Sequence, residues 1–298
     1  MKIGLLIQIA NIDIFNKIKN IIDNFDSNVI LMLHLNNILK NEDVNAIKNE
    51  FNKAIFTYGE NKGMDIYAFL LQIEYIINNN IEVDYICKIH TKTNEKWRND
   101  LIYNICGSKD IVSNCINLMN EFGMICSKKC YKMFDHLNSP ILLRMLEHYN
   151  IENKYIDEID WKKKEEIKYD LDLFDPYFYI TYRYNNIMYD NELLKNIDKL
   201  NSYAIFHWLQ IGYKHFKFVP NRNLIKKKVD TNFKFVAGTM FWINANILID
   251  FLTKINFTSY FDMFEKKYFN NMKPTFTHSW ERLFSIIIYH NNKKIKDI

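Results

Sequence analysis

Three basic side chains alternate along one short segment of the sequence: Lys88, His90 and Lys92. Side chains two positions apart on a strand point to the same face, so we expect all three on one face where a strand ends. Cations so placed repel each other unless an anion binds among them, and a diphosphate meets that need. Arg98 follows nearby and is expected to contribute to the same site. The alternative is that the strand ends here and the lysines reach solvent.

A glycine turn made by Asn61, Lys62 and Gly63 leads into Asp65 at the predicted start of a helix. An acidic residue in the first helical turn can cap the backbone amides, or it can accept a hydrogen bond from a ribose or a base. Both interpretations fit the residue type. We expect these four residues to contribute to nucleotide binding.

Strand character returns over residues 233–245, and Gly238 interrupts the bulky, aromatic part of this segment, 235–242. Glycine in a strand often marks a close approach by a ligand or another backbone. Gly238, Thr239 and Trp242 are therefore candidates for substrate binding, with the rings of Trp242 and Phe241 as a stacking platform for a sugar ring. The alternative is a core strand in which every second residue is buried.

A predicted helix over 277–290 begins with His278, Glu281 and Arg282. Glu281 is either an acid favoured by the helix dipole or a general base. We predict Glu281, Arg282 and His90 as the catalytic candidates, and His278 as a further substrate-binding candidate.

The elements that must position these residues alternate between short apolar runs and amphipathic segments. Strands are predicted at 3–9, 28–35, 54–58, 84–90 and 123–126, with helices between them, including 43–51, 65–78 and a helical stretch over 93–122. This order predicts an α/β fold, a mostly parallel sheet flanked by helices. Sites in such sheets lie at the carboxyl ends of the strands, so the segments after Ile9, Tyr58 and Ile89 are expected to converge.

Composition excludes several classes of protein. The 298 residues include only 7 glycines, and neither the dinucleotide nor the P-loop glycine fingerprint occurs. The net charge of +4 is mild, so a nucleic-acid partner is not expected. No segment reaches the roughly 20 apolar residues that span a bilayer. Five cysteines without a CxxC pair predict reduced thiols, no zinc site and a cytoplasmic protein.

These motifs, in this order, resemble the rhamnan-synthesis F family of glycosyltransferases, found in bacterial polysaccharide clusters and in some large DNA viruses. The matching positions are Asn61, Gly63, Asp65, Ile66, Phe69 and Leu70, then Lys88, His90, Lys92, Trp97 and Arg98, then Gly238 to Trp242, and finally Glu281 with Arg282. One position departs from the family pattern, because Met64 stands where an arginine is usual.

The aromatic segment 170–222 resembles a module of other polysaccharide glycosyltransferases. Its matching positions are Phe174, Asp175, Phe178, Tyr179, His207 and Gly212, with Trp208 in place of the usual tyrosine. We therefore expect one domain over 1–298 that contains a small helical insert at 170–222.

The resemblance implies a GT-A-like domain that binds a nucleoside-diphosphate sugar as donor. Such enzymes commonly hold Mn²⁺ or Mg²⁺ with an Asp-x-Asp at the strand end that Lys88, His90 and Lys92 occupy here. We expect these cations to neutralise the diphosphate without a metal. No other cofactor is expected, and metal use is the disfavoured alternative.

The predicted function is transfer of a sugar, rhamnose or another hexose, from the nucleotide to a glycan or lipid-linked acceptor. A lipid-linked acceptor implies peripheral membrane contact. The expected location is the cytoplasm, meaning the host cytoplasm or a virus factory if the chain is viral. The competing class is a non-catalytic carbohydrate-binding or scaffold protein that retains the fold. A sugar-nucleotide epimerase would normally need the missing dinucleotide fingerprint.

Overall fold

The structure is a computed structural model that describes residues 1–134, 139–167, 170–183, 197–210, 212–214, 218–227, 229, 233–266 and 274–298. The chain divides into two compact units. The first, which we call the sheet unit, comprises Met1–Met133, Lys234–Tyr268 and Trp280–Ile298. The second unit comprises Phe134–Phe233 and Phe269–Ser279. Within the described part of the chain, no helix combines the length and apolar character needed to cross a bilayer.

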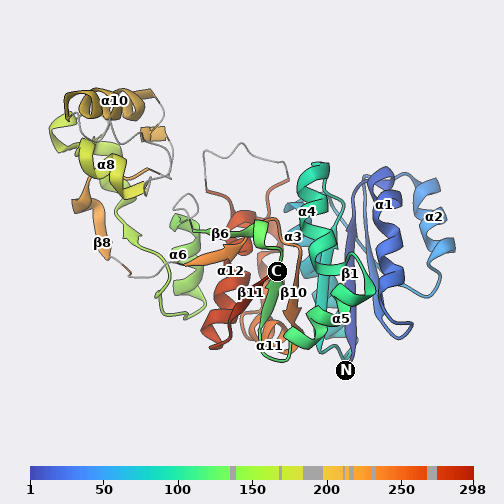
Figure 1. The fold of residues 1–298 in the computed structure, drawn as a ribbon. Helices are drawn as coiled ribbons and strands as arrows, with labels where there is room; N and C mark the ends of the chain where they lie inside the picture. The colour runs from blue at the N-terminus through green and yellow to red at the C-terminus, as the bar shows by residue number, and fades with distance from the viewer. Residues whose placement is uncertain are drawn as a thin grey trace. The chain divides into compact units, whose positions relative to one another are not determined.

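A seven-stranded sheet in the order β11-β5-β10-β4-β1-β2-β3 forms the centre of the sheet unit (Figure 1). Its strands are β1 (Ile3–Ile9), β2 (Ile30–Asn36), β3 (Ile55–Gly59), β4 (Tyr85–His90), β5 (Met124–Cys126), β10 (Phe241–Asn244) and β11 (Ile295–Asp297). Every neighbouring pair is parallel except the two that involve β10. The predicted α/β fold with a mostly parallel sheet is confirmed.

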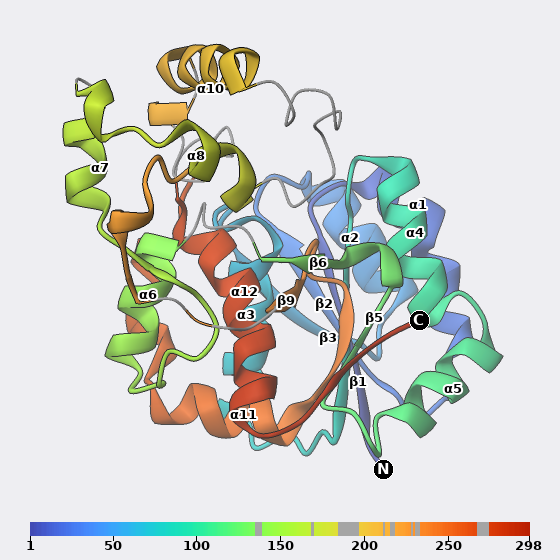
Figure 2. The same ribbon diagram turned by 60° about the vertical axis from the view of Figure 1, so that its left-hand side comes forward.

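Helices cover both faces of this sheet. They are α1 (Ile12–Ile18), α2 (Asn41–Glu50), α3 (Met64–Asn78), α4 (Glu95–Cys106), α5 (Lys109–Leu118), α11 (Ala245–Lys254) and α12 (Phe276–His290). Figure 2 shows α3 and α12 on one side of the strands and α1, α4 and α5 on the other. Strands covered on both sides are mostly apolar, which is why the runs in β1 and β4 were recognisable from sequence although Gln8, Lys88 and His90 interrupt them.

Most predicted elements agree with the structure to within one or two residues, for example 84–90 against the observed Tyr85–His90. The helical stretch over 93–122 is two helices, because the chain breaks at Gly107 and Ser108 caps the second helix by accepting a hydrogen bond from Ile111 N. Asn11 caps α1 in the same way through Ile14 N.

The predicted strand character over residues 233–245 is confirmed at both ends of that range, but the prediction of one continuous strand is wrong. Gly238 has φ +83° and Thr239 has φ +49°, so the backbone turns between two separate strands. The first, β9 (Lys234–Val236), pairs with β6 (Tyr131–Met133) in a small sheet of its own, and the second is β10. Positive φ is rare for a β-branched residue, so Thr239 marks a strained position.

The second unit has its own aromatic core, in which Phe174, Tyr179 and Trp208 pack together. Its elements are α6 (Ser139–His148), β7 (Glu158–Ile159), α7 (Trp161–Ile167), α8 (Pro176–Arg183), α10 (Ile197–Gln210) and β8 (Ile225–Lys227). The predicted insert at 170–222 falls within this unit and supplies α8 and α10, but 184–196, 211 and 215–217 lie outside the described residues. The division into one domain with an insert stays a prediction.

Candidate functional site

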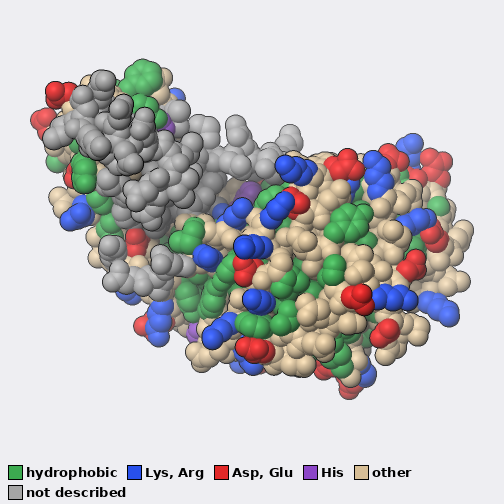
Figure 3. All heavy atoms as spheres, in the orientation of Figure 1, with side chains coloured by type: hydrophobic (Ala, Val, Ile, Leu, Met, Phe, Trp, Pro, Cys, Tyr) green, Lys and Arg blue, Asp and Glu red, His purple; other side chains and the backbone are tan. Residues whose placement is uncertain are grey.

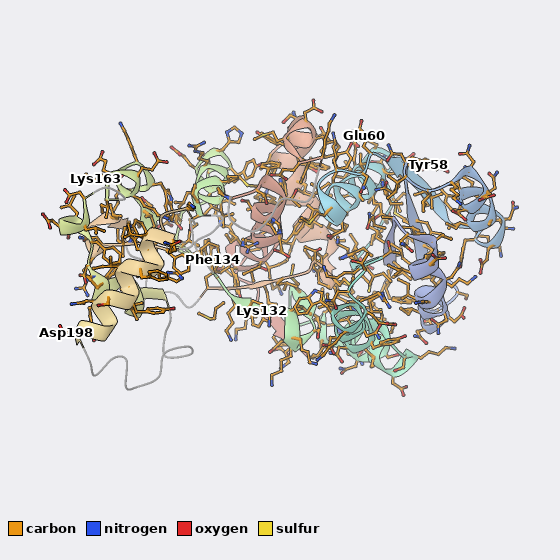
Figure 4. All side chains as sticks on the ribbon, turned by 90° about the horizontal axis from the view of Figure 1, so that it is seen from above. Tyr58, Glu60, Lys132, Phe134, Lys163 and Asp198 are labelled. Atoms are coloured by element: carbon orange, nitrogen blue, oxygen red, sulfur yellow. The ribbon has the colours of Figure 1, made fainter. Side chains whose placement is uncertain are left out.

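The crevice expected in a parallel sheet lies where the strand order reverses, at the carboxyl ends of β1 and β4. Figure 4 looks down on this end of the sheet unit, where Tyr58 and Glu60 mark the exit from β3. Two backbone amides join the neighbouring loops here, because Thr91 N donates to Gln8 O (3.1 Å) and Ala10 N donates to Thr91 Oγ1 (2.9 Å). The predicted convergence of the segments after β1 and β4 is therefore met.

A row of buried polar side chains crosses the four parallel strands near this end. His90 pairs laterally with Gln8, Gln8 with His34, and His34 with Thr57, so all four lie on one face of the sheet. His34 Nδ1 is 3.1 Å from Thr57 Oγ1, whereas His34 Nε2 and His90 Nδ1 are buried with no hydrogen-bond partner among the described residues. Sequence analysis missed this row. The signal was Gln8, which interrupts the apolar run of β1.

Asp65 lies at the centre of a polar network in the sheet unit. Its Oδ2 atom accepts hydrogen bonds from Lys88 Nζ (2.5 Å) and from the Thr239 hydroxyl, and lies 3.5 Å from His90 Nδ1. Lys88 Nζ also donates to Thr239 O (2.7 Å). The network thus joins α3, β4 and the turn before β10, which are far apart in the sequence.

Burial sets the charge states in this network. Burial alone would raise the pKa of Asp65, but the charges and hydrogen bonds around it hold that pKa well below its usual range. Burial lowers the pKa of Lys88, and Asp65 opposes that shift. Burial also lowers the pKa of His90 to about 3, so its imidazole is neutral near pH 7. The Lys88 ammonium is therefore the cation that balances Asp65 at neutral pH.

Local backbone geometry aims Asp65 at Lys88. Gly63 and Met64 both have positive φ, +58° and +52°, directly before Asp65 on α3. A side chain at Gly63 would also clash, since an added Cβ would lie 2.6 Å from Phe264 Cδ1. Gly63 N donates to Glu265 O (2.8 Å), which fixes the turn. Glycine is required here by both conformation and packing.

The neighbouring turn residues contact the protein itself. Asn61 is exposed, and its Oδ1 accepts a hydrogen bond from Asn36 Nδ2 (3.2 Å). Lys62 is buried, with its Nζ 4.5 Å from the centre of the Tyr67 ring and 3.7 Å from Asp262 Oδ1. Both residues lie on the loop that leads to Asp65, as the sequence predicts.

Helix α12 holds the strained turn that carries Thr239. Gly238 N donates to Glu281 Oε1 (2.5 Å), and Val236 N donates to Ser285 Oγ (3.1 Å). Arg282 pairs with Glu281 Oε2 (2.7 Å) and lies 4.1 Å over the Phe235 ring. Both carboxylate oxygens of Glu281 are thus engaged, which favours a role in positioning the turn.

Three predicted site residues are not part of the Asp65 network as described above: Trp242, His278 and Arg98. Trp242 is fully buried on the opposite sheet face from Lys88, where its Nε1 donates to Ile105 O (2.9 Å) and its ring stacks on Phe25. Strand alternation explains this, since its neighbour Phe241 shares the Lys88 face. His278 belongs to the second unit, where its Nδ1 is 2.6 Å from Thr275 Oγ1.

Arg98, the third, is buried in α4 and braces the loop after β4. Its Nη1 donates to Lys92 O (2.9 Å), and its Nη2 lies 3.3 Å from Glu95 Oε1. Lys92 lies in that loop rather than on the strand, because β4 ends at His90. Its side chain is half-buried, and its ammonium has no hydrogen bond or ion pair among the residues that the structure describes.

The donor set at this strand end does not suit a divalent metal. Its carboxylate, Asp65, is already paired with Lys88, and ammonium groups are not ligands. Over the described parts of the chain, no three His, Cys, Asp or Glu side chains gather as a metal site would require.

The sheet unit has a second surface feature, a shallow depression of about 340 Å³ at the free edge of β3. Residues of β3 and α3 line it, and none belongs to the Asp65 network.

Acidic side chains lie among the basic ones on the face drawn in Figure 3, so the surface there carries charges of both signs.

Comparison with known proteins adds no family assignment. No protein-family model matches the chain, and no curated protein is significantly similar to it.

Proposed function

We propose that the chain is a glycosyltransferase that moves a sugar from a nucleoside-diphosphate donor to a glycan or lipid-linked acceptor. The observation that carries this proposal is the Asp65 network, which gathers residues from three of the four motifs at the carboxyl ends of β1 and β4. That end of an α/β sheet is where nucleotides bind. The fourth motif, Glu281 with Arg282, supports the same network through Gly238.

In this proposal the acceptor hydroxyl oxygen bonds to the anomeric carbon of the sugar as the bond from that carbon to the diphosphate oxygen breaks. The diphosphate leaves with the bonding electrons, and the hydroxyl proton passes to a base. His90 can accept a hydrogen bond from that hydroxyl, because a neutral imidazole has one nitrogen without a proton, but its low pKa opposes taking the proton itself, which passes to water. Glu281 holds the turn that carries Thr239.

The resemblance of the four motifs to the rhamnan-synthesis F family supports a GT-A-like domain of that type. It would act in polysaccharide or glycoprotein glycan synthesis in the cytoplasm. A lipid-linked acceptor would bring the protein to a membrane surface.

A thermal-shift screen of nucleotide sugars, with and without Mn²⁺, tests the proposal. A ligand that binds the native state raises the melting temperature as its concentration exceeds its dissociation constant. We expect one donor class to stabilise the protein and to be hydrolysed slowly, with no loss on EDTA treatment. A flat response to every donor contradicts the proposal. Binding without hydrolysis or transfer favours the carbohydrate-binding scaffold instead.

A further inference from the structure

The buried charges of the candidate site cancel in pairs. Lys88 balances Asp65, Arg282 balances Glu281, and His90 is neutral near pH 7. The cluster therefore has no net charge with which to attract a diphosphate. This differs from the sequence-based prediction, in which Lys88, His90 and Lys92 are all cations that bind an anion together.

Lys92 is the cation that this pairing leaves over. It is close enough to Lys88 and His90 to act on both electrostatically. Its backbone is held by Arg98, while its ammonium is free among the described residues. It follows directly on the β4 end, beside Thr91, which ties this loop to β1.

Asp65, Gln8 and His90 offer a ligand hydrogen-bonding atoms rather than a net charge. Every contact to Asp65 is made through Oδ2, so Oδ1 has no hydrogen bond within the described structure. The Asp65 side chain keeps 14% of its surface exposed. Gln8 and His90 lie side by side on the same sheet face. These groups suit hydroxyls and amides.

We propose that this site, if it binds a nucleotide as above, divides its ligand: Lys92 binds the diphosphate, while Asp65 Oδ1, Gln8 and His90 bind uncharged hydroxyl or amide groups. Lys88 is a positioning residue that does not touch the ligand. If Lys88 moved to bind a phosphate, the buried Asp65 carboxylate would lose its counter-ion, and a buried unpaired charge is strongly unfavourable.

Calorimetric titration with nucleoside diphosphates and their matching nucleosides tests this division. The probes are uridine, guanosine and thymidine, each as the free nucleoside and as the diphosphate. The measured quantity is the ratio of nucleoside to diphosphate dissociation constants. We expect Lys92→Met to lower this ratio about tenfold, because one charged contact is lost, while nucleoside binding is unchanged. Lys96→Met, an exposed lysine in the same segment, is the matched control and should leave the ratio unaltered.

Lys88→Met should weaken nucleoside and diphosphate binding together and leave their ratio unchanged. If that variant does not fold, the Lys88→Met/Asp65→Asn double variant, which removes both charges of the pair, takes its place. An unchanged ratio in Lys92→Met, or a ratio that falls only when Lys88 is replaced, overturns the division while leaving the proposed function standing. Failure of the wild-type protein to bind any of the diphosphates counts against the proposed function itself.

Discussion

At the scale of single residues, the Asp65–Lys88 pair decides how the candidate site is organised. The Lys88 side chain is 2% exposed and bonds to both Asp65 and the strained Thr239. Such a pair costs free energy to desolvate, so it specifies geometry more than it adds stability. The pair thus fixes the relative positions of α3, β4 and the turn before β10.

Asp65→Asn should reduce the free energy of unfolding by about 3–5 kcal/mol, because it leaves the Lys88 charge buried without a counter-ion. Urea denaturation measures the loss. Asp250→Asn is the matched control, since its pair with Lys254 is exposed on both sides, and should change stability by less than about 1 kcal/mol. Equal stability of the Asp65 variant and wild type would contradict the buried-pair interpretation.

Sequence patterns indicated which residues of this site are unusual but not how they pair. Lys88 and Asp65 were both singled out, yet their contact depends on the packing of α3 against β4, which no local pattern encodes. Gln8 was visible as a break in an apolar run, but its neighbours on other strands follow only from the sheet register. The prediction put Trp242 on the wrong face of the sheet, because a shift of one residue along a strand moves a side chain to the opposite face.

At the scale of elements, α12 supports the site indirectly through the turn at Gly238 and Thr239. An added Cβ at Gly238 would lie 3.0 Å from Leu101 Cδ1, so the turn is held from both sides. The helix and the parallel strands were predictable from their periodicity. The strand character of β10 was predicted too, but the turn before it was not, because positive φ at Thr239 carries no sequence signal for a β-branched residue.

Glu281→Gln and Glu281→Ala separate positioning by α12 from base catalysis. Glutamine keeps an acceptor for Gly238 N but leaves the buried Arg282 charge without its carboxylate, so we expect lower stability, with donor affinity and turnover of the folded variant within about threefold of wild type. Alanine leaves that amide unpaired and should weaken donor binding by about tenfold. Calorimetry measures affinity, and donor hydrolysis measures turnover. Loss of turnover in the glutamine variant with intact donor binding would return Glu281 to the role of base.

At the scale of the whole molecule, two compact units each have a core of their own, and the Asp65 network lies entirely within the sheet unit. Buried histidines in that unit make global stability depend on pH. His34 is fully buried, and burial lowers its pKa to about 4. His90 shifts in the same direction, to about 3, in the field of Asp65, Lys88 and Lys92.

The unfolded chain binds a proton at each of these histidines below about pH 6.5, whereas the native state does not until about pH 4 or lower. The stability that comes from burying these two imidazoles in their neutral form is therefore fully present above pH 6.5 and is lost as the pH falls. The low pKa of Asp65 acts in the same direction, but only below its unfolded value of about 4. The window between pH 7 and pH 5 consequently isolates the histidines.

Between pH 7 and pH 5 the free energy of unfolding should fall by about 2 kcal/mol less in His34→Gln than in wild type. The reason is that the variant has no imidazole to protonate at this position on unfolding. Urea denaturation at both pH values measures the difference. Thr57→Val is the control: it removes the hydroxyl 3.1 Å from His34 Nδ1 and lowers stability at each pH, yet leaves the titrating imidazole and the pH slope in place. Equal slopes for wild type and His34→Gln would mean that His34 is protonated in the native state, which the burial of Nε2 with no hydrogen-bond partner in the described part of the chain argues against.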